Sequence, residues 1–302
     1  MVLRGQGSGC SSSRAVAGPS RISSGPRRLS ARNAVSAPRP ELPIINFNFA
    51  DEIDENTRQS LSSAQREGFK ADFARELKTI SAWARQHWFP LRRFALQVFV
   101  SGTYKISKAL VPAWSGQRGR MEFPAWRLNA GNPAIMHELT HVFFPNGNRF
   151  LAEGFAVHLQ AAIGGNPAFP NFGRPLHASA RERLTQMLPG FADGANASLA
   201  PLHLGDLDSI ATPSPLVLAI GSDSYGEDAN GQACIYPIAG SFVEFLIASR
   251  GMTKFCTLYR RTPLRQHQLA AGLVQRWSEV YGSSLGELEM EWRSFIVNGS
   301  QS

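Results

Sequence analysis

The sequence predicts an α+β fold, with a small mixed β part on the N-terminal side and a mainly helical part after it. Short segments with strand-like patterning occur only before residue 131, whereas beyond Gly131 the apolar residues recur mostly at helical spacing. With 43% hydrophobic residues among 302, the chain can bury a sizeable core. We therefore expect one folded region at residues 41–302, divided into a mixed lobe at 41–130 and a helical lobe at 131–302.

Residues 1–40 form a basic leader of different composition. Ser, Arg, Gly and Pro fill 25 of these 40 positions, and the segment has seven arginines and no acidic residue. Such a segment buries too little apolar surface to offset its conformational entropy, so it is predicted to be disordered. Its Arg- and Ser-rich composition resembles that of an organelle transit peptide, whereas its frequent Gly and Pro favour a solvated linker or a misassigned start equally well.

The net charge of +8 comes almost entirely from this leader. Without its seven arginines the chain has 24 basic and 23 acidic side chains, a net charge of +1. A nucleic-acid-binding face is therefore not expected in the folded region. No apolar run approaches the roughly 18 residues that span a bilayer, so no transmembrane segment is expected. Because there is no secretory signal or disulfide framework, the sequence weakly favours an intracellular or organellar protein, although a bridge between Cys234 and Cys256 is compatible with it.

The mixed lobe is predicted from four segments. Residues 42–49 alternate weakly between apolar and polar and are consistent with a strand, and residues 94–100 have the apolar character of a buried strand. Between them, residues 56–88 repeat apolar side chains at helical spacing until a proline stops the helix. Residues 118–128 are expected to form a further strand, at the edge of the sheet because Pro124 lacks an N–H.

The helical lobe is predicted from apolar residues that recur three and four positions apart. The expected helices cover residues 133–144, 149–163, 179–188, 237–249, 253–260, 264–277 and 284–297. The stretch at 189–233 is rich in Gly, Pro, Ser and Asp, and is expected to form loops with short elements.

One motif carries chemistry, the H-E-L-T-H at residues 137–141. On a helix, positions four apart differ by about 40° around the axis, so His137 and His141 lie on one face. Two neutral imidazoles at this spacing can bind a single Zn²⁺. Glu138 lies about 100° further round the helix, where it can reach a metal-bound water without being a ligand. Without a metal, the motif would be two surface histidines beside a solvated glutamate.

A catalytic zinc needs a third protein ligand, for which Glu153 is the candidate. It is the only acidic residue between Glu138 and Glu182, and it lies in an apolar run near the start of the next predicted helix. Burying its carboxylate without a cation would be costly, and a short turn can fold this helix back beside the first. The alternative is an exposed glutamate at a helix start, where the helix dipole favours negative charge.

These residues together resemble the gluzincin metallopeptidases, in which two histidines and a downstream glutamate bind zinc. H-E-L-T-H is followed at 150–156 by F-L-A-E-G-F-A, which resembles the family's W-x-x-E-G-x-A signature with Phe150 in the aromatic place. The segment Y-P-I-A-G-S-F-V-E-F-L at 236–246 resembles a helix start of aminopeptidase-like gluzincins. The segment G-S-S-L-G-E-L-E-M-E-W at 282–292 resembles the closing segment of the bacterial peptidase-MA-like group. The first two segments are specific, and the last two are weaker.

The resemblance implies a zincin-like catalytic domain and a zinc metallopeptidase that hydrolyses peptide bonds in a peptide or protein substrate. His137, His141 and Glu153 would bind one Zn²⁺. Glu138 would be the general base that assists attack by a zinc-bound water, and later the proton shuttle. Tyr236 would match the tyrosine whose hydroxyl stabilises the tetrahedral oxyanion.

Two positions in this assignment have alternatives or departures. Tyr236 is interpreted almost equally well as an aromatic residue packed at a helix start, and Tyr225 is a weaker candidate for the same role. The second-shell acid of thermolysin-like enzymes, four residues after Glu153, is absent because Val157 occupies that position. The strand predicted at 118–128 is the candidate for binding the substrate backbone in extended form.

Two other functions are compatible with the sequence. A catalytically silent zinc-binding or interaction protein would retain the zincin fold, but a scaffold without turnover has no need of the intact Glu138. Alternatively, the basic leader would bind nucleic acid or a membrane surface. That function predicts salt-dependent binding that is lost when residues 1–40 are deleted.

Overall fold

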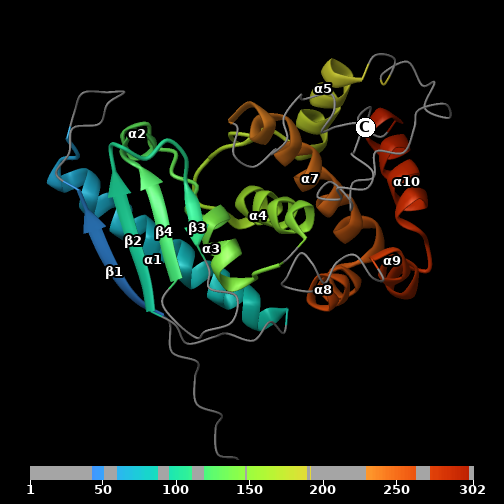
Figure 1. Cartoon of the computed structure of the whole chain (residues 1–302), viewed down its shortest axis with the longest axis horizontal. Coiled ribbons are helices and arrows are strands. Elements are labelled where there is room, and N and C mark those ends of the chain that lie inside the picture. The colour runs from blue at the N-terminus through green and yellow to red at the C-terminus, as the bar shows by residue number, and fades with distance from the viewer. Residues whose placement is uncertain are drawn as a thin grey trace, which may run out of the picture. The chain divides into compact units, whose positions relative to one another are not determined.

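The computed structural model describes residues 43–50, 60–87, 95–110, 119–146, 148–188, 191, 229–262 and 273–298 (Figure 1). All of them belong to one compact unit of the chain, Pro40–Ser302. The leader predicted at 1–40 and most of the loop stretch predicted at 189–233 lie outside the described residues. A small mixed sheet is combined with helices, so the fold is α+β as the sequence predicts.

The sheet has four strands in the order β1-β2-β4-β3, in which β3 alone is antiparallel to its neighbour. The strands are β1 (Ile44–Phe49), β2 (Ala95–Ser101), β3 (Lys108–Leu110) and β4 (Gly119–Pro124). β1 and β2 lie within two residues of the strands predicted from the sequence. β3 is not anticipated, because three residues are too few to produce a recognisable alternation.

The strand predicted at 118–128 is shorter than expected and lies elsewhere in the sheet. β4 ends at Pro124, and the short helix α2 (Ala125–Asn129) follows it directly. β4 pairs with β2 on one side and with β3 on the other, so the prediction of an edge strand is wrong. Pro124 is tolerated because it is the last residue of the strand, where the ladder of hydrogen bonds ends. The edge on this side of the sheet is β3.

The long helix α1 (Ser63–Gln86) packs on the sheet. It begins with a capping box, in which Ser62 Oγ accepts from the Gln65 N–H and the Gln65 side chain accepts from the Ser62 N–H. This cap sets the helix start later than the predicted residue 56. Aromatic rings join the helix to the sheet with centroids 5.3–6.1 Å apart: Phe69 and Phe73 on α1, Phe47 on β1 and Phe123 on β4.

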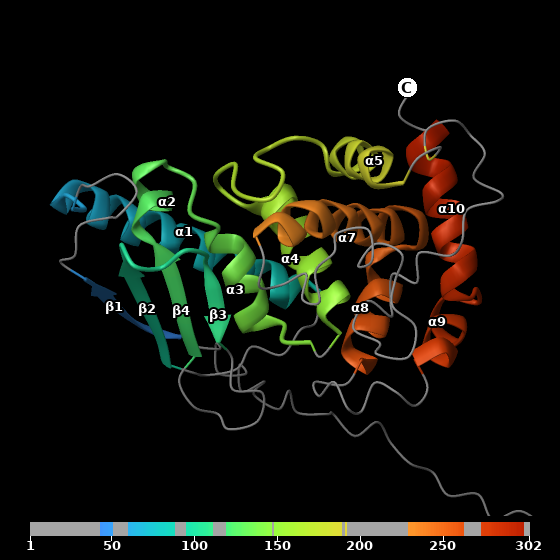
Figure 2. The same ribbon diagram turned by 45° about the horizontal axis from the view of Figure 1, so that its top comes forward.

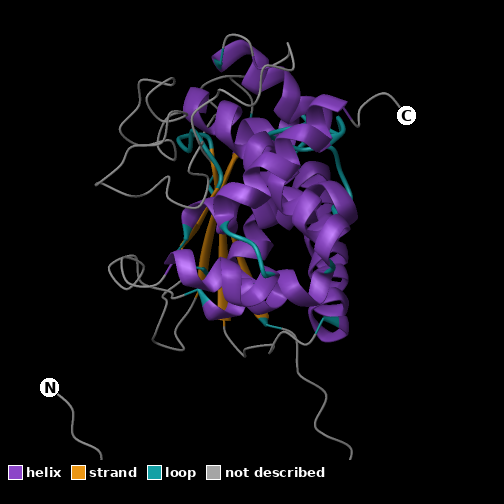
Figure 3. Ribbon diagram, turned by 90° about the vertical axis from the view of Figure 1, so that its right-hand side faces the viewer, coloured by secondary structure: helices purple, strands orange, loops and turns teal. Residues whose placement is uncertain are grey.

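The helices after the sheet gather mainly to one side of the strands (Figure 3). They are α3 (Ile135–Phe143), α4 (Arg149–Ile163), α5 (Leu176–Met187), α7 (Ala229–Arg250), α8 (Met252–Arg261), α9 (Leu273–Tyr281) and α10 (Leu285–Asn298). The bounds of α4 are those predicted, and the other described ends differ by a few residues. Residues 264–272 of the helix predicted at 264–277 lie outside the described part of the chain.

The largest difference among these helices is at α7. The sequence predicts a helix start at Pro237, because proline is favoured in the first turn. The helix in fact begins at Ala229, and Pro237 lies inside it. Proline in a helix interior removes one backbone hydrogen bond. The apolar face that α7 buries around this proline, from Ile235 to Ala239, outweighs that cost.

Two glycines allow α7 to lie close along α4 (Figure 2). A Cβ atom at Gly154 of α4 would lie 2.6 Å from the carbonyl oxygen of Ala239, and one at Gly240 of α7 would lie 2.4 Å from Val157 Cγ1. Any larger residue would therefore push the two helices apart. This close approach brings the first half of α7 next to Glu153 on α4.

Two further expectations can be compared with the described residues. None of the described helices is both long enough and apolar enough to cross a membrane. The Cys256 thiol on α8 is buried and free, and the side chain of Cys234 lies outside the described part of the structure.

Candidate metal centre

The H-E-L-T-H motif lies on α3, and its two histidines meet a glutamate of α4. The Nε2 atoms of His137 and His141 are 3.2 Å apart, and each lies 3.2 Å from Oε2 of Glu153. The three atoms therefore form a nearly equilateral triangle. In the part of the chain that the structure describes, this is the one group of three His, Cys, Asp or Glu side chains arranged to share an ion.

The triangle has the size of one face of a tetrahedral metal site. Zinc binds imidazole nitrogen and carboxylate oxygen at about 2.0–2.2 Å, which places two tetrahedral ligand atoms about 3.3 Å apart. The observed separations of 3.2 Å fit this value. Two imidazoles and one carboxylate leave the fourth corner free, as in catalytic sites and unlike structural ones. The donor set therefore fits a tetrahedral divalent ion with an open position.

The electrostatics of the three residues favour an ionised carboxylate. Burial raises the pKa of Glu153, but the charge of His141 and the contacts with both imidazoles outweigh burial, so this pKa lies well below its ordinary value. Burial lowers the pKa of His141, but Glu153 raises it by more. Arg149 adds positive charge, with its Nε 4.0 Å from Glu153 Oε1. Glu153 is thus kept in the deprotonated form that binds a cation.

Glu138 lies beside the triangle without belonging to it. Its side chain is on the same helix as both histidines and only 4% of the residue is exposed. Burial raises the pKa of its carboxyl group, and the charges of His137 and His141 offset part of that rise. A carboxylate in this position can exchange a proton with a group next to the ion.

The structure also places Tyr236 at this site, on α7. Its ring stacks on the His137 ring, with the centroids 5.8 Å apart, and its hydroxyl is close enough to Glu153 to be affected by that charge. Burial and the negative charge of Glu153 raise its pKa well above the ordinary value, so the phenol keeps its proton. Its position depends on the helix start at Ala229, since Tyr236 lies well inside α7 and not at its first turn. Tyr225 lies outside the described residues.

The N-terminus of α3 is held by a side chain of α4 and lies near a buried glutamate of α1. The helix has no side-chain cap of its own. Gln160 Oε1, on α4, accepts from the His137 N–H at 3.2 Å. Glu76 Oε1, on α1, accepts from the Gly165 N–H at 3.2 Å, and the Met136 N–H lies near enough to Glu76 to favour its ionised form. The direction in which α3 presents its histidines therefore depends on the bond from α4, a dependence that the sequence does not reveal.

The second ring nitrogen of His137 contacts no acidic side chain among the described residues. Its Nδ1 is buried and makes no hydrogen bond to any described residue. Metal-binding imidazoles usually donate this N–H to a carboxylate, carbonyl or water. Val157, four residues after Glu153, occupies the position where thermolysin-like enzymes have an acidic residue. It is fully buried among apolar side chains. In this protein the ring of His137 is oriented by its contact with the ring of Tyr236 and by the backbone bond to Gln160.

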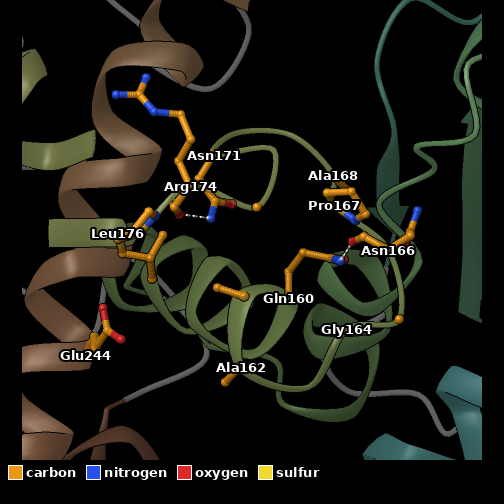
Figure 4. A pocket seen from close by; sticks show the side chains of 14 residues that line it. Gln160, Ala162, Gly164, Asn166, Pro167, Ala168, Asn171, Arg174, Leu176 and Glu244 are labelled. Atoms are coloured by element: carbon orange, nitrogen blue, oxygen red, sulfur yellow. Dashed lines mark hydrogen bonds between the residues drawn. The ribbon is translucent and has the colours of Figure 1, made fainter. Parts of the chain in front are cut away.

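A separate pocket of about 400 Å³ lies at the C-terminal end of α4 (Figure 4). Gln160, the loop at 164–175 and Glu244 of α7 line it. Gln160 connects the two regions, because its Nε2 donates to the Asn166 carbonyl at 2.9 Å while its Oε1 bonds to α3. None of the three metal-site residues lines this pocket, so it is distinct from the candidate metal centre.

Arg127, on α2, belongs to the same region and is missed by the sequence analysis. It is almost fully buried, and the charge of Glu138 is close enough to raise its pKa against the lowering caused by burial. A single arginine after a strand is not part of any recognisable motif. The sequence therefore gives no signal that Arg127 has a functional role. Only the folding of α2 towards α3 shows that it is near the site.

The structure brings the five predicted site residues together: His137, Glu138, His141, Glu153 and Tyr236.

Searches for a matching protein family, a similar curated protein and a similar solved structure each find no match to this chain. The functional argument therefore depends on the residues and geometry of the site.

Proposed function

We propose that this protein is a zinc-dependent metallopeptidase with a gluzincin-like catalytic domain of the zincin type, acting on peptide or protein substrates. The observation that carries the proposal is the convergence of His137 Nε2, His141 Nε2 and Glu153 Oε2 at mutual distances of 3.2 Å. The H-E-x-x-H spacing on α3 and the glutamate on the neighbouring helix α4 support the gluzincin resemblance. One Zn²⁺ bound by these three residues would act as a Lewis acid that activates water and polarises the scissile carbonyl.

The roles of the neighbouring residues follow from their positions. Glu138 accepts the proton of the attacking water and then delivers it to the leaving amine. Tyr236 keeps its proton and donates a hydrogen bond to the oxyanion that develops on the substrate carbonyl. The burial of both side chains excludes bulk water and strengthens these interactions.

The substrate backbone is assigned to β3, in place of the strand predicted at 118–128. β3 is the edge of the sheet on the side of β4, and it contacts α3, which carries the histidines. An edge strand has unpaired backbone N–H and C=O groups that can pair with an extended peptide. A substrate paired with β3 would pass alongside the candidate metal centre.

The test measures bound zinc and peptide cleavage in the wild type and in Glu138→Gln. We expect about one zinc per chain in both proteins, and a kcat about 10²–10⁴-fold lower in the variant, the usual contribution of a general base. Glu67→Gln is the matched control, because Glu67 is an exposed residue of α1 paired with Lys70. It should retain full activity.

Two outcomes would contradict the proposal. Equal cleavage by the wild type and Glu138→Gln would remove Glu138 as the base. Zinc bound to both proteins, without cleavage of any peptide in a random library, would instead support the catalytically silent zinc-binding protein.

A further inference from the structure

Arg127 is a buried cation that interacts with the charge of Glu138 but makes no hydrogen-bonded ion pair with a described residue. Only 7% of the residue is exposed. Its Nε and Nη1 atoms are buried and have no hydrogen-bond partner among the described residues. The other buried arginine, Arg293 on α10, shows the usual arrangement, with Glu289 one helical turn away at 3.9 Å. Arg127 makes no such ion pair within the described part of the chain, so its guanidinium has hydrogen-bonding capacity in reserve.

Aromatic rings hold the guanidinium in place. Its Cζ lies 4.7 Å from the centroid of the Trp126 ring and 5.2 Å from that of Phe169. Such contacts stabilise a cation and fix the plane of the group, but they use none of its N–H donors. The guanidinium is therefore positioned by the rings while its Nε and Nη1 donors remain unused by the described residues.

The same rings connect Arg127 to the candidate metal centre. The Phe169 ring meets the Tyr236 ring edge-on at 6.1 Å, and Tyr236 stacks on His137 at 5.8 Å. Glu138, the proposed base, is close enough to Arg127 for their charges to interact. Since an extended peptide advances about 3.3–3.6 Å per residue, a substrate held at the metal centre can reach Arg127 within a few residues of the scissile bond.

We propose that Arg127 binds a carboxylate of the substrate, and that the preferred substrates have a free C-terminus or an acidic side chain within a few residues of the cleaved bond. This inference rests on the proposed function. A guanidinium accepts a carboxylate through two parallel N–H···O bonds, which are stronger than neutral hydrogen bonds. Burying a cation that makes no hydrogen-bonded ion pair is costly to the fold, so a ligand that supplies a hydrogen-bonded anion is favoured.

The kinetic test compares matched peptides that differ only in the carboxylate. One pair has a free or an amidated C-terminus, and the other has Glu or Gln near the scissile bond. For one of the two pairs we expect the wild type to show a kcat/KM at least about tenfold higher with the carboxylate, from one charge-assisted hydrogen bond. Which pair shows the preference identifies the source of the carboxylate.

Substitution of Arg127 should remove this preference. In Arg127→Gln the ratio of kcat/KM between acid and amide peptides should fall to near one. In Arg183→Gln it should stay at the wild-type value, because Arg183 is a half-buried residue of α5 that donates to Gln186 and has no described contact with the site. If Arg127→Gln slows both members of each pair equally, Arg127 merely supports Glu138 or the fold, and the proposal is wrong.

A binding test separates this inference from the proposed function. With metal-free protein, N-acetylglycinate should raise the melting temperature of the wild type and of Arg183→Gln, but not of Arg127→Gln, and N-acetylglycinamide should raise none of them. Equal shifts in the wild type and Arg127→Gln would overturn the carboxylate site. A carboxylate-specific shift in a protein that cleaves no peptide would leave the binding site standing and remove the peptidase.

A stability measurement distinguishes a binding residue from a structural one. In Arg127→Met an unbranched apolar side chain takes the place of the guanidinium beside both rings, so the buried charge is removed. The variant should unfold at the same temperature as the wild type or at a higher one. A melting temperature clearly below that of the wild type, together with an unchanged acid-to-amide ratio in Arg127→Gln, would show that Arg127 only stabilises the fold.

Discussion

At the level of single residues, the candidate site combines groups that are unfavourable to bury unless a cation lies between them. Glu153 is held ionised beside two imidazole nitrogens, each 3.2 Å away. The neighbouring Glu138 is a second buried carboxylate, on α3 itself. A divalent cation bound by the three atoms of the triangle would compensate both charges, which supports the proposed metal site over a solvated surface.

Replacing Glu153 should therefore weaken metal binding strongly while leaving the fold intact. In Glu153→Gln, the amide keeps the shape of the side chain but cannot supply an anionic ligand. We expect the zinc affinity to fall by more than about 100-fold, beyond the loss seen when a second-shell partner is removed. The measurement is competition against a chromophoric chelator. Glu182→Gln, on the exposed side of α5, is the control and should bind zinc as the wild type does. Unchanged affinity in Glu153→Gln would show that Glu153 is not a ligand.

At the level of secondary-structure elements, the site depends on how closely α7 lies along α4. Gly154 follows the proposed ligand Glu153, and a Cβ atom there would lie 2.6 Å from the Ala239 carbonyl oxygen on α7. Because the clashing atom belongs to a helix backbone, it cannot move aside as a flexible side chain would. In the sequence, the proposed ligand Glu153 is thus followed directly by Gly154, the glycine that allows Tyr236 of α7 to approach Glu153.

The pair Gly154→Ala and Gly68→Ala tests this packing. Both glycines lie inside helices, where alanine is favoured by about 1 kcal/mol. At Gly68, on the exposed side of α1, a Cβ atom meets nothing within 4 Å, so this variant should be more stable than the wild type by up to that amount. Gly154→Ala should be less stable by about 1–3 kcal/mol, because overpacking outweighs the propensity. Chemical denaturation measures both. If the two variants change stability in the same direction, the close approach of α4 and α7 is not constrained by Gly154.

At the level of the whole molecule, Glu76 links the sheet-covering helix α1 to the elements that carry the site. Its residue is 1% exposed, and its Oε1 accepts from the Gly165 N–H at the end of α4. Burial raises its pKa from the ordinary value of 4.5 to about 7, although the Gly165 N–H and the charge of Arg75 act in the opposite direction. The folded state is therefore more stable when the Glu76 carboxyl group is protonated than when it is ionised.

This raised pKa predicts how stability changes with pH. Between about pH 4.5 and 7 the folded state binds more protons at Glu76 than the unfolded state does, so the free energy of unfolding falls as the pH rises. The total change is on the order of 3 kcal/mol. Glu76→Gln, which keeps the acceptor for Gly165, should match the wild type near pH 4.5 and exceed it at pH 8. The measurement is denaturant unfolding of the metal-free proteins at both values. A difference between the two proteins that is independent of pH would contradict it.

The sequence by itself determined the α+β class, most helix positions and the five residues placed at the site, because these depend on local patterns. The period of apolar residues defines helices such as α4, and the four-residue spacing of His137 and His141 puts both on one helical face whatever surrounds them. Only the tertiary structure decided which strand lies at the edge of the sheet, that α7 runs through Pro237, and that Arg127 and Glu76 lie near the site. These features depend on contacts between residues far apart in the chain, where packing and burial outweigh local propensity, so no short sequence pattern encodes them.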